Sequence, residues 1–330
     1  MKAIVVEKAG PPEVLTIRDW PKPEPKRGWV LIRVRAFGLN RSEMYTRQGH
    51  SPSVKFPRVL GIECVGVVEA APGGEVQPGE KVAAVMGGMG REFDGGYAEY
   101  TLVPASQVLP VRTGLDWATF GALPETFLTA SRAMDEGLDA QPGEWLLVRG
   151  ATSSVGMAAI ALAKDRGLRV IATTRNPKKA ANLKRSGADH VVIDGGRIAE
   201  AARELVPDGV DRVLELVGTV TLRDSLRTVR RKGTLCMAGI LGNAWTLKDF
   251  SPLEDLPNTV RLSMYTTHDV NRSNSTENLQ KIADGVAAGR LPANLDRTFR
   301  FDEIVAAHSY MESNSAVGKL VVVVRENGKN

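Results

Sequence analysis

Cysteine is scarce in this sequence. The 330 residues include two cysteines, Cys64 and Cys236, which lie far apart and have no Cys or His neighbour at metal-ligand spacing. A disulfide framework is therefore not expected. A structural zinc lobe is not expected either, because such a lobe needs four close ligands.

Long apolar runs are absent as well. The longest, residues 155–163, is far too short to span a bilayer. The first ten residues, MKAIVVEKAG, contain a short apolar run broken by Glu7, which indicates a strand and not a signal peptide. Together with the cysteine content, these absences predict a reduced, cytoplasmic protein with no membrane partner.

Charge of one sign is never concentrated. There are 43 basic and 38 acidic residues, the net charge is +5, and no block of five or six like charges occurs. A nucleic-acid or membrane surface is therefore not expected, whereas a small polyanionic ligand suits the slight positive excess.

The patterns that are present predict two domains, since 330 residues are too many for one ordinary core. Residues 1–124 carry short apolar or alternating runs between Pro/Gly turns, which is typical of a β-rich barrel or sandwich. In residues 125–267 strands alternate with helices, which predicts a doubly wound parallel sheet of six strands. In residues 268–330 the last strand, 318–324, is expected to return to the N-terminal domain. The glycine-rich segment 87–96 is predicted to be a long flexible loop, which is either a lid or, more simply, a wide hairpin turn.

The chain is organised around residues 145–156, WLLVRGATSSVG, which predict a strand, a tight turn and a helix. Small residues in such a turn let the backbone approach a pyrophosphate, and the helix N-terminus favours its charge. A dinucleotide fingerprint has glycines at positions 151, 153 and 156, and here only Gly156 is present. A buried strand–helix unit without a ligand therefore stays open as an alternative.

The end of the next predicted strand, residues 169–173, indicates the cofactor. An NAD site has a carboxylate there to bind the adenosine ribose. This chain has Arg175 and Lys179 instead, and no acidic residue before Asp189. Because cations pair with a 2′-phosphate, we predict NADP(H) in preference to NAD(H). An exposed basic helix start is the simpler alternative.

At this point nearly the whole chain resembles the medium-chain dehydrogenase/reductase superfamily, in particular its zinc-free quinone oxidoreductase (ζ-crystallin-like) branch. The resemblance is carried by the segments GLNRSEMYTRQG, FPRVLGIECVGVVEAAPG, DGGYAEYTLVP, GATSSVG and GKLVVVV. It implies an α/β protein in which a GroES-like catalytic domain, residues 1–124 and 268–330, accompanies a Rossmann NADP-binding domain, residues 125–267. The nicotinamide and the substrate are then expected in the cleft between them.

Zinc ligands are missing at the positions where the resemblance would place them. The zinc-dependent members carry a Cys where this chain has Asn40, and a His where it has Ile62 between Gly61 and Glu63. We therefore expect no metal site and no polarisation of an alcohol oxygen by zinc.

The resemblance also implies where the functional residues lie. Asn40 and Tyr45 match an Asn and a Tyr near the nicotinamide and substrate, and they are the expected catalytic residues. The remaining matches are expected cofactor contacts in the turn, at strand ends and near the C-terminus: Thr129, Ala151, Thr152, Ser153, Ser154, Val155, Gly156, Thr174, Arg175, Lys179, Gly218, Gly239, Ile240, Leu241 and Lys319.

Simpler structural roles stay open for several of these residues. Asn40 is also suited to shaping a turn, Tyr45 to packing as an interface aromatic, and Thr129 to bonding its own helix backbone. Glu63 is expected to pair within the barrel. Ser153 stands where the branch usually has glycine, and its hydroxyl is a candidate donor to phosphate.

These expectations predict an NADPH-dependent, zinc-independent reductase of quinones or activated C=C bonds. One alternative is a metal-free alcohol/aldehyde oxidoreductase. Another is a catalytically silent, crystallin-like protein that binds NADPH or RNA. The resemblance further implies a homodimer that pairs the edge strands, residues 261–264, of two nucleotide domains.

Overall fold

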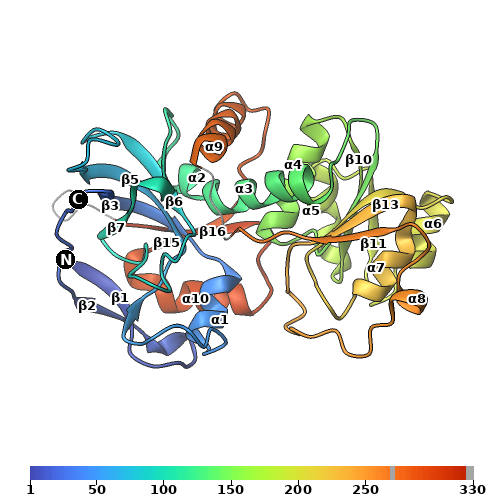
Figure 1. Cartoon of the computed structure of the whole chain (residues 1–330), viewed down its shortest axis with the longest axis horizontal. Helices are drawn as coiled ribbons and strands as arrows, with labels where there is room; N and C mark the ends of the chain where they lie inside the picture. The colour runs from blue at the N-terminus through green and yellow to red at the C-terminus, as the bar shows by residue number, and fades with distance from the viewer. Residues whose placement is uncertain (268–271, 325–330) are drawn as a thin grey trace. The chain divides into compact units, whose positions relative to one another are not determined.

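The computed structural model describes residues 1–267 and 272–324, which form two compact units (Figure 1). The first unit contains Met1–Leu128, Thr267–Gly289 and the chain from Leu295 onward. The second contains Thr129–Thr266 and Arg290–Asn294. The predicted boundary at 268 lies outside the described residues. The sequence did not suggest the grouping of Arg290 with the second unit, in which Arg290 forms an ion pair with Asp165.

The first unit is built on two sheets. The larger has the order β15-β16-β3-β5-β6-β8, with β7 also paired to β3, and the smaller has the order β2-β1-β4. The strands of the larger sheet are β3 (Trp29–Gly38), β5 (Glu63–Ala70), β6 (Lys81–Val85), β7 (Tyr100–Pro104), β8 (Val108–Pro110), β15 (Leu295–Arg300) and β16 (Lys319–Val323). Those of the smaller are β1 (Lys2–Val6), β2 (Leu15–Asp19) and β4 (Arg58–Val59).

The last described strand, β16, lies between β15 and β3 in the larger sheet. In β16, Val321 lies opposite Gly38 of β3, and the two strands are antiparallel. The prediction that the C-terminal strand returns to the N-terminal domain is therefore confirmed. The helices of this unit are α1 (Arg41–Arg47), α2 (Trp117–Gly121), α9 (Arg272–Ala287) and α10 (Ile304–Glu312), together with the start of α3 (Pro124–Arg132).

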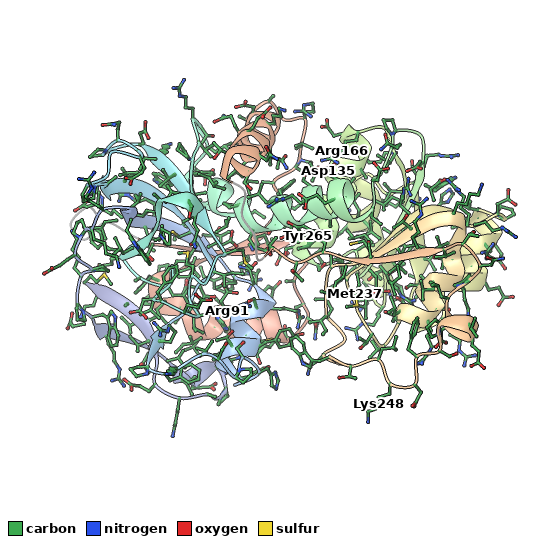
Figure 2. All side chains as sticks on the ribbon, in the orientation of Figure 1. Arg91, Asp135, Arg166, Met237, Lys248 and Tyr265 are labelled. Atoms are coloured by element: carbon green, nitrogen blue, oxygen red, sulfur yellow. The ribbon has the colours of Figure 1, made fainter. Side chains whose placement is uncertain are left out.

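The segment 87–96 is anchored by hydrogen bonds to β4, to Trp20 just after β2, and to α1. The carboxylate of Asp94 accepts hydrogen bonds from Val59 N at 3.1 Å, Arg58 Nη1 at 2.9 Å and Trp20 Nε1 at 2.9 Å. Arg91 donates to Ser42 Oγ at the start of α1 (Figure 2). The segment is therefore a packed series of turns, closer to the wide hairpin turn than to a free loop.

The second unit is a parallel sheet in the order β11-β10-β9-β12-β13-β14. Its strands are β9 (Trp145–Arg149), β10 (Arg169–Thr174), β11 (His190–Ile193), β12 (Val210–Glu215), β13 (Val229–Met237) and β14 (Arg261–Met264). The helices are α4 (Ser154–Asp165), α5 (Ala180–Arg185), α6 (Ala199–Leu205), α7 (Leu222–Thr228) and α8 (Pro252–Asp255). The strand order reverses between β9 and β12, so the predicted doubly wound sheet is confirmed.

The core of the second unit explains the apolar runs in its central strands. Leu147, Ile171, Val213 and Leu235, from four adjacent strands, are buried in one cluster that includes Leu226 of α7. A sheet covered on both faces needs apolar side chains on both, which gives continuous runs in place of alternation. Among the described residues, no helix is long and apolar enough to cross a membrane.

Candidate functional site

The turn between β9 and α4 is closed by its own hydrogen bonds. Ser153 is the N-cap of α4: its Oγ accepts from Gly156 N at 3.2 Å and donates to Gly150 O at 2.8 Å. A serine at this position satisfies one of the helix's free N–H groups. The hydroxyl hydrogen that we considered for a phosphate is thus already donated to Gly150, and Ser153 acts here as a cap.

The turn nevertheless fits an anion. The N–H groups of Thr152, Ser154 and Val155 donate to no acceptor in the described part of the chain. The last two begin a helix of twelve residues, whose dipole favours negative charge at this end. Gly156 allows the close approach of helix and turn, because a Cβ there would lie 2.7 Å from Ala151 Cα. These features suit the pyrophosphate of a dinucleotide.

Arg175 follows β10 and is exposed. Within residues 1–267 and 272–324 its guanidinium makes no hydrogen bond or ion pair. The preceding Thr174 is buried and caps the local turn, accepting from Asn176 N at 3.2 Å. Lys179 lies in the short 3₁₀ helix Pro177–Lys179, five residues after the end of β10. The structure therefore leaves a cation available at the place where the sequence predicts a 2′-phosphate.

The predicted contacts at Gly218 and at residues 239–241 lie in the loops after β12 and β13, and the structure brings these loops together. Leu241 N donates to Leu216 O at 3.0 Å. Gly218 has φ +97°, and a Cβ there would lie 2.9 Å from Gly239 O. Both the positive φ and the close approach require glycine at this position.

Glu215, at the end of β12, is a residue of this region that sequence reasoning missed. Its Oε1 accepts from Val217 N at 2.7 Å and Gly218 N at 2.9 Å, and its Oε2 accepts from Ser225 Oγ. Burial raises its pKa above the usual value, although these hydrogen bonds oppose the shift. The available signal was an acidic residue at the end of an otherwise apolar strand.

A second group of polar residues is buried inside the first unit, around Lys319. Its Nζ lies 2.6 Å from Glu63 Oε1 and 2.5 Å from Asn40 Oδ1, with Glu125 Oε2 at 3.8 Å. The amide nitrogen of Asn40 donates to Glu63 Oε1 at 3.0 Å and to Glu43 Oε1 at 3.3 Å. We call Asn40, Glu43, Glu63, Glu125 and Lys319 the buried charge cluster.

Burial and neighbouring charges together set the protonation states in this cluster. Burial lowers the pKa of Lys319, but the carboxylates of Glu63 and Glu125 raise it above its usual value, so the ammonium is retained. Burial raises the pKa of Glu43 to about 7. The cluster therefore pairs one fixed ammonium with Glu63 and contains, in Glu43, a carboxyl group that titrates near neutral pH.

The cluster changes the interpretation of two predicted site residues. Both N–H groups of Asn40 face carboxylates and its oxygen faces an ammonium, so the amide is fully hydrogen-bonded within the unit. Lys319 is 1% exposed, and its ammonium group is paired with Glu63 and Asn40 inside the same unit. Direct contacts of either residue with substrate or cofactor remain predictions. The expectation that Glu63 pairs within the barrel is confirmed.

Tyr45 and Thr129 are placed separately from this cluster. Tyr45 lies on α1 and is almost fully buried. Burial raises its pKa above the usual value of 10.0, while Arg41 opposes the shift, so the phenol keeps its proton at neutral pH. Thr129 is buried on α3. Their predicted roles near the nicotinamide stay predictions.

Metal ligands are not gathered in the described residues, where no group of three or more His, Cys, Asp or Glu side chains is arranged to hold an ion. Asn40 and Ile62 occupy the two positions discussed above, and Ile62 N donates to Glu43 Oε1 at 3.0 Å. Zinc independence remains a prediction from these residue types.

Comparison with known families gives two matches. Residues 26–113 match the alcohol dehydrogenase GroES-like domain, and residues 186–322 match a family described as zinc-binding dehydrogenase. The two matches fall on the β-rich first part of the chain and on the region that includes the second half of the parallel sheet.

Curated relatives align along almost the full length. A quinone oxidoreductase from Lama guanicoe is 28% identical, over 98% of this chain and 98% of its own length. A 2-haloacrylate reductase from Burkholderia sp is 29% identical, over 97% and 98%. Both kinds of match support a protein of the medium-chain dehydrogenase/reductase superfamily that is similar to quinone oxidoreductases. The resemblance drawn from its sequence motifs is thus confirmed.

Solved structures of this superfamily share the whole fold. A mycobacterial protein complexed with NADPH has a TM-score of 0.87 at 26% identity, covering 98% of this chain and 99% of its own. An NAD-dependent alcohol dehydrogenase has a TM-score of 0.88 at 28% identity, covering 98% and 100%. The second unit is accordingly a Rossmann domain for a nicotinamide cofactor, and the first unit is GroES-like.

Proposed function

We propose that this member of the medium-chain dehydrogenase/reductase superfamily uses NADPH to reduce quinones or activated C=C bonds, and that it does so without a metal. Full-length similarity to quinone oxidoreductase and 2-haloacrylate reductase supports the substrate classes. The free N–H groups at the start of α4 and the free guanidinium of Arg175 support the cofactor.

The cofactor, when bound, supplies a hydride, and the protein supplies position and electrostatics. Ser154 and Val155 N–H groups would hold the pyrophosphate, and Arg175 would hold the 2′-phosphate. Tyr45 keeps a proton on Oη at neutral pH, so it is our candidate donor to the oxygen on which charge develops. The Asn40 amide holds Lys319, Glu63 and Glu43 in one arrangement on the same unit.

Arg175 carries the cofactor proposal, and it is tested by titrating NADPH and NADH into wild type and Arg175→Ala. We expect a selective loss of NADPH affinity of about tenfold or more, because a phosphate loses its charged partner. Arg185→Ala, which removes an exposed arginine from the end of α5, is the matched control. An equal loss for both cofactors in Arg175→Ala would defeat the 2′-phosphate assignment.

A panel of quinones, enones, haloacrylates, aldehydes and alcohols, followed by NADPH absorbance, tests the reaction. Turnover of quinones or enones supports the proposal. Turnover confined to alcohols and aldehydes would support the alternative, which the similarity to an NAD-dependent alcohol dehydrogenase favours. Cofactor binding with no turnover would indicate a silent protein.

We also propose a cytoplasmic homodimer. The two cysteines are free and buried, which suits a reducing compartment. In the described residues β14 pairs with β13 alone, and it exposes Leu262 by 40% and Met264 by 66%. Pairing with β14 of a second copy would cover this edge.

A further inference from the structure

Arg149, the last residue of β9, has a fully buried guanidinium surrounded by acceptors. Its Nε donates to Asp194 Oδ2 at 2.8 Å and its Nη2 to Asp194 Oδ1 at 3.0 Å. Its Nη1 donates to Asp224 Oδ2 at 2.8 Å and Ser225 Oγ at 2.9 Å, both in α7. The two-pronged pairing with Asp194 matches the planar geometry of guanidinium and carboxylate.

Asp194 stands beside the proposed 2′-phosphate site. It is the first residue after β11, and its N–H donates to Thr174 O at 2.9 Å. Thr174 lies opposite Ile193 in the parallel pair of β10 and β11. Arg175 and Asp194 therefore follow neighbouring strands at the same, carboxyl end of the sheet. Burial alone raises the pKa of Asp194, but Arg149 and, to a smaller degree, Arg175 lower it, so the carboxylate is ionised.

We infer that Arg149 determines cofactor preference by holding the Asp194 carboxylate, which leaves Arg175 free for a 2′-phosphate. The inference rests on the proposed use of NADPH. Arg149 itself contacts no cofactor in this account, and it acts as a positioning residue through Asp194.

The physical reason is the charge that Arg149 neutralises. An ionised carboxylate at the end of a strand next to β10 would pair with Arg175 or repel a 2′-phosphate. A carboxylate near the adenosine ribose is also the feature that favours NAD(H). With Arg149 paired to both of its oxygens, Asp194 instead accepts from Gly196 N at 2.8 Å and shapes its own loop.

The Rossmann domain contains a second buried arginine–carboxylate pair, which lies away from the carboxyl ends of the strands and serves as a control. Arg212 donates to Glu144 through Nε at 2.8 Å and Nη2 at 3.0 Å, and it is almost fully buried. Glu144 immediately precedes β9, so this pair lies at the opposite ends of the strands. Arg212→Met together with Glu144→Gln therefore reproduces the loss of a buried arginine without changing charge beside Arg175.

The experiment measures binding of 2′,5′-ADP and 5′-AMP by calorimetry, because these probes differ only in the 2′-phosphate. Arg149→Met is expected to weaken 2′,5′-ADP about tenfold and 5′-AMP by less than about twofold: Asp194 and Asp224 both lose their charged partner, and Asp194 is the one beside Arg175. Adding Asp194→Asn to Arg149→Met is expected to restore the wild-type ratio of 2′,5′-ADP affinity to 5′-AMP affinity. The Arg212→Met/Glu144→Gln control is expected to lower thermal stability while leaving the ratio unchanged.

The outcomes separate the inference from the proposed function. A wild type that binds both probes equally would overturn the use of NADPH itself. A wild type that prefers 2′,5′-ADP, with the same ratio in Arg149→Met, would overturn only the role of Arg149. If Arg149→Met does not fold, the double variant and Asp194→Asn decide. The Arg149→Met/Asp194→Asn and Asp194→Asn variants must both prefer 2′,5′-ADP over 5′-AMP at least as strongly as wild type does. A loss of this preference in Asp194→Asn would overturn the inference.

Discussion

Glu43 is a fully buried carboxyl group with partners on one oxygen only. Its Oε1 accepts from Ile62 N and from the Asn40 amide, whereas its Oε2 has no hydrogen-bond partner among the described residues. It is surrounded by Glu63 and Lys319 of the buried charge cluster and by Tyr97. Burial raises its pKa from 4.5 to about 7, so the folded protein holds a proton here that the unfolded chain releases.

This shift predicts a pH-dependent stability. The contribution of Glu43 to the free energy of unfolding is fully present below its unfolded pKa of 4.5 and is lost as pH rises through about 7. The loss amounts to about 3 kcal/mol across that window. Urea unfolding at several pH values should therefore show a flatter profile for Glu43→Gln than for wild type. Glu204→Gln, on an exposed face of α6, is the control and should keep the wild-type slope.

Asn40 holds the buried charge cluster together, so Asn40→Ala should affect both stability and turnover. Two carboxylates and an ammonium each lose a hydrogen bond in a buried setting, which costs about 1–3 kcal/mol. We expect turnover to fall while NADPH affinity changes little, because the cofactor-phosphate contacts lie in the other unit. Unaltered turnover at saturating NADPH would remove Asn40 from the mechanism.

Single residues show what sequence reasoning achieves and where it stops. The absence of a carboxylate at the end of β10 identified Arg175, because the spacing along one strand and one turn is local. The partners of Asn40 could not be predicted in this way, since Lys319 is 279 residues away and meets it only after β16 pairs with β3. Arg149 was passed over because a charged residue in an apolar strand gives no indication of which acceptors surround it.

Among the elements, α4 and the turn before it depend on one close approach. A Cβ on residue 156 would lie 2.7 Å from the Cα and O atoms of Ala151, where only backbone is available to move. Gly156→Ala is therefore expected to lower the free energy of unfolding by about 1–3 kcal/mol and to weaken NADPH binding. Thermal unfolding and calorimetric titration measure the two effects.

The control for this substitution is Gly114→Ala, because a Cβ at residue 114 meets no atom within 4 Å and its φ is not positive. It should leave both quantities near wild type. If Gly156→Ala behaves like the control, the turn tolerates displacement from the helix, and the fit of the pyrophosphate to this turn has to be reconsidered.

Elements were predictable in proportion to their burial. The central strands β9 and β10 of the Rossmann domain are almost wholly buried, so their apolar runs stand out in the sequence. Four of the five residues of β2 are not buried and β4 has only two residues, so neither strand gives an apolar run in the sequence. Residues 177–185 form a 3₁₀ turn followed by α5, since Asn176 accepts a hydrogen bond from Lys178 N and caps a separate turn.

For the whole molecule, the exposed edge of the Rossmann sheet predicts self-association. Leu262→Lys with Met264→Lys places charges on β14, which repel across a two-fold axis, so the double variant should be a monomer where wild type is a dimer. Light scattering coupled to gel filtration measures the mass. Ile17→Lys is the control, because Ile17 is also 40% exposed on a strand, β2, that pairs with one neighbour only. A monomeric wild type would contradict the proposal.

The discontinuity of the first unit was predictable because a lone C-terminal strand needs a sheet to join. That argument assigns β16 to the first unit, and its pairing with β3 agrees. The place of Arg290–Asn294 in the second unit was not predictable, because Arg290 meets Asp165, 125 positions away in the chain, only in the folded protein.

The return of β16 to β3 also sets an order of events on the ribosome. Asn40 and Glu63 leave the exit tunnel early, whereas Lys319 is made 279 residues after Asn40, roughly 15 to 60 seconds later at ordinary rates of synthesis. All strands of the Rossmann sheet, from Trp145 to Met264, emerge during that interval. The whole Rossmann sheet is therefore synthesised before Lys319 is available to complete the buried charge cluster of the first unit.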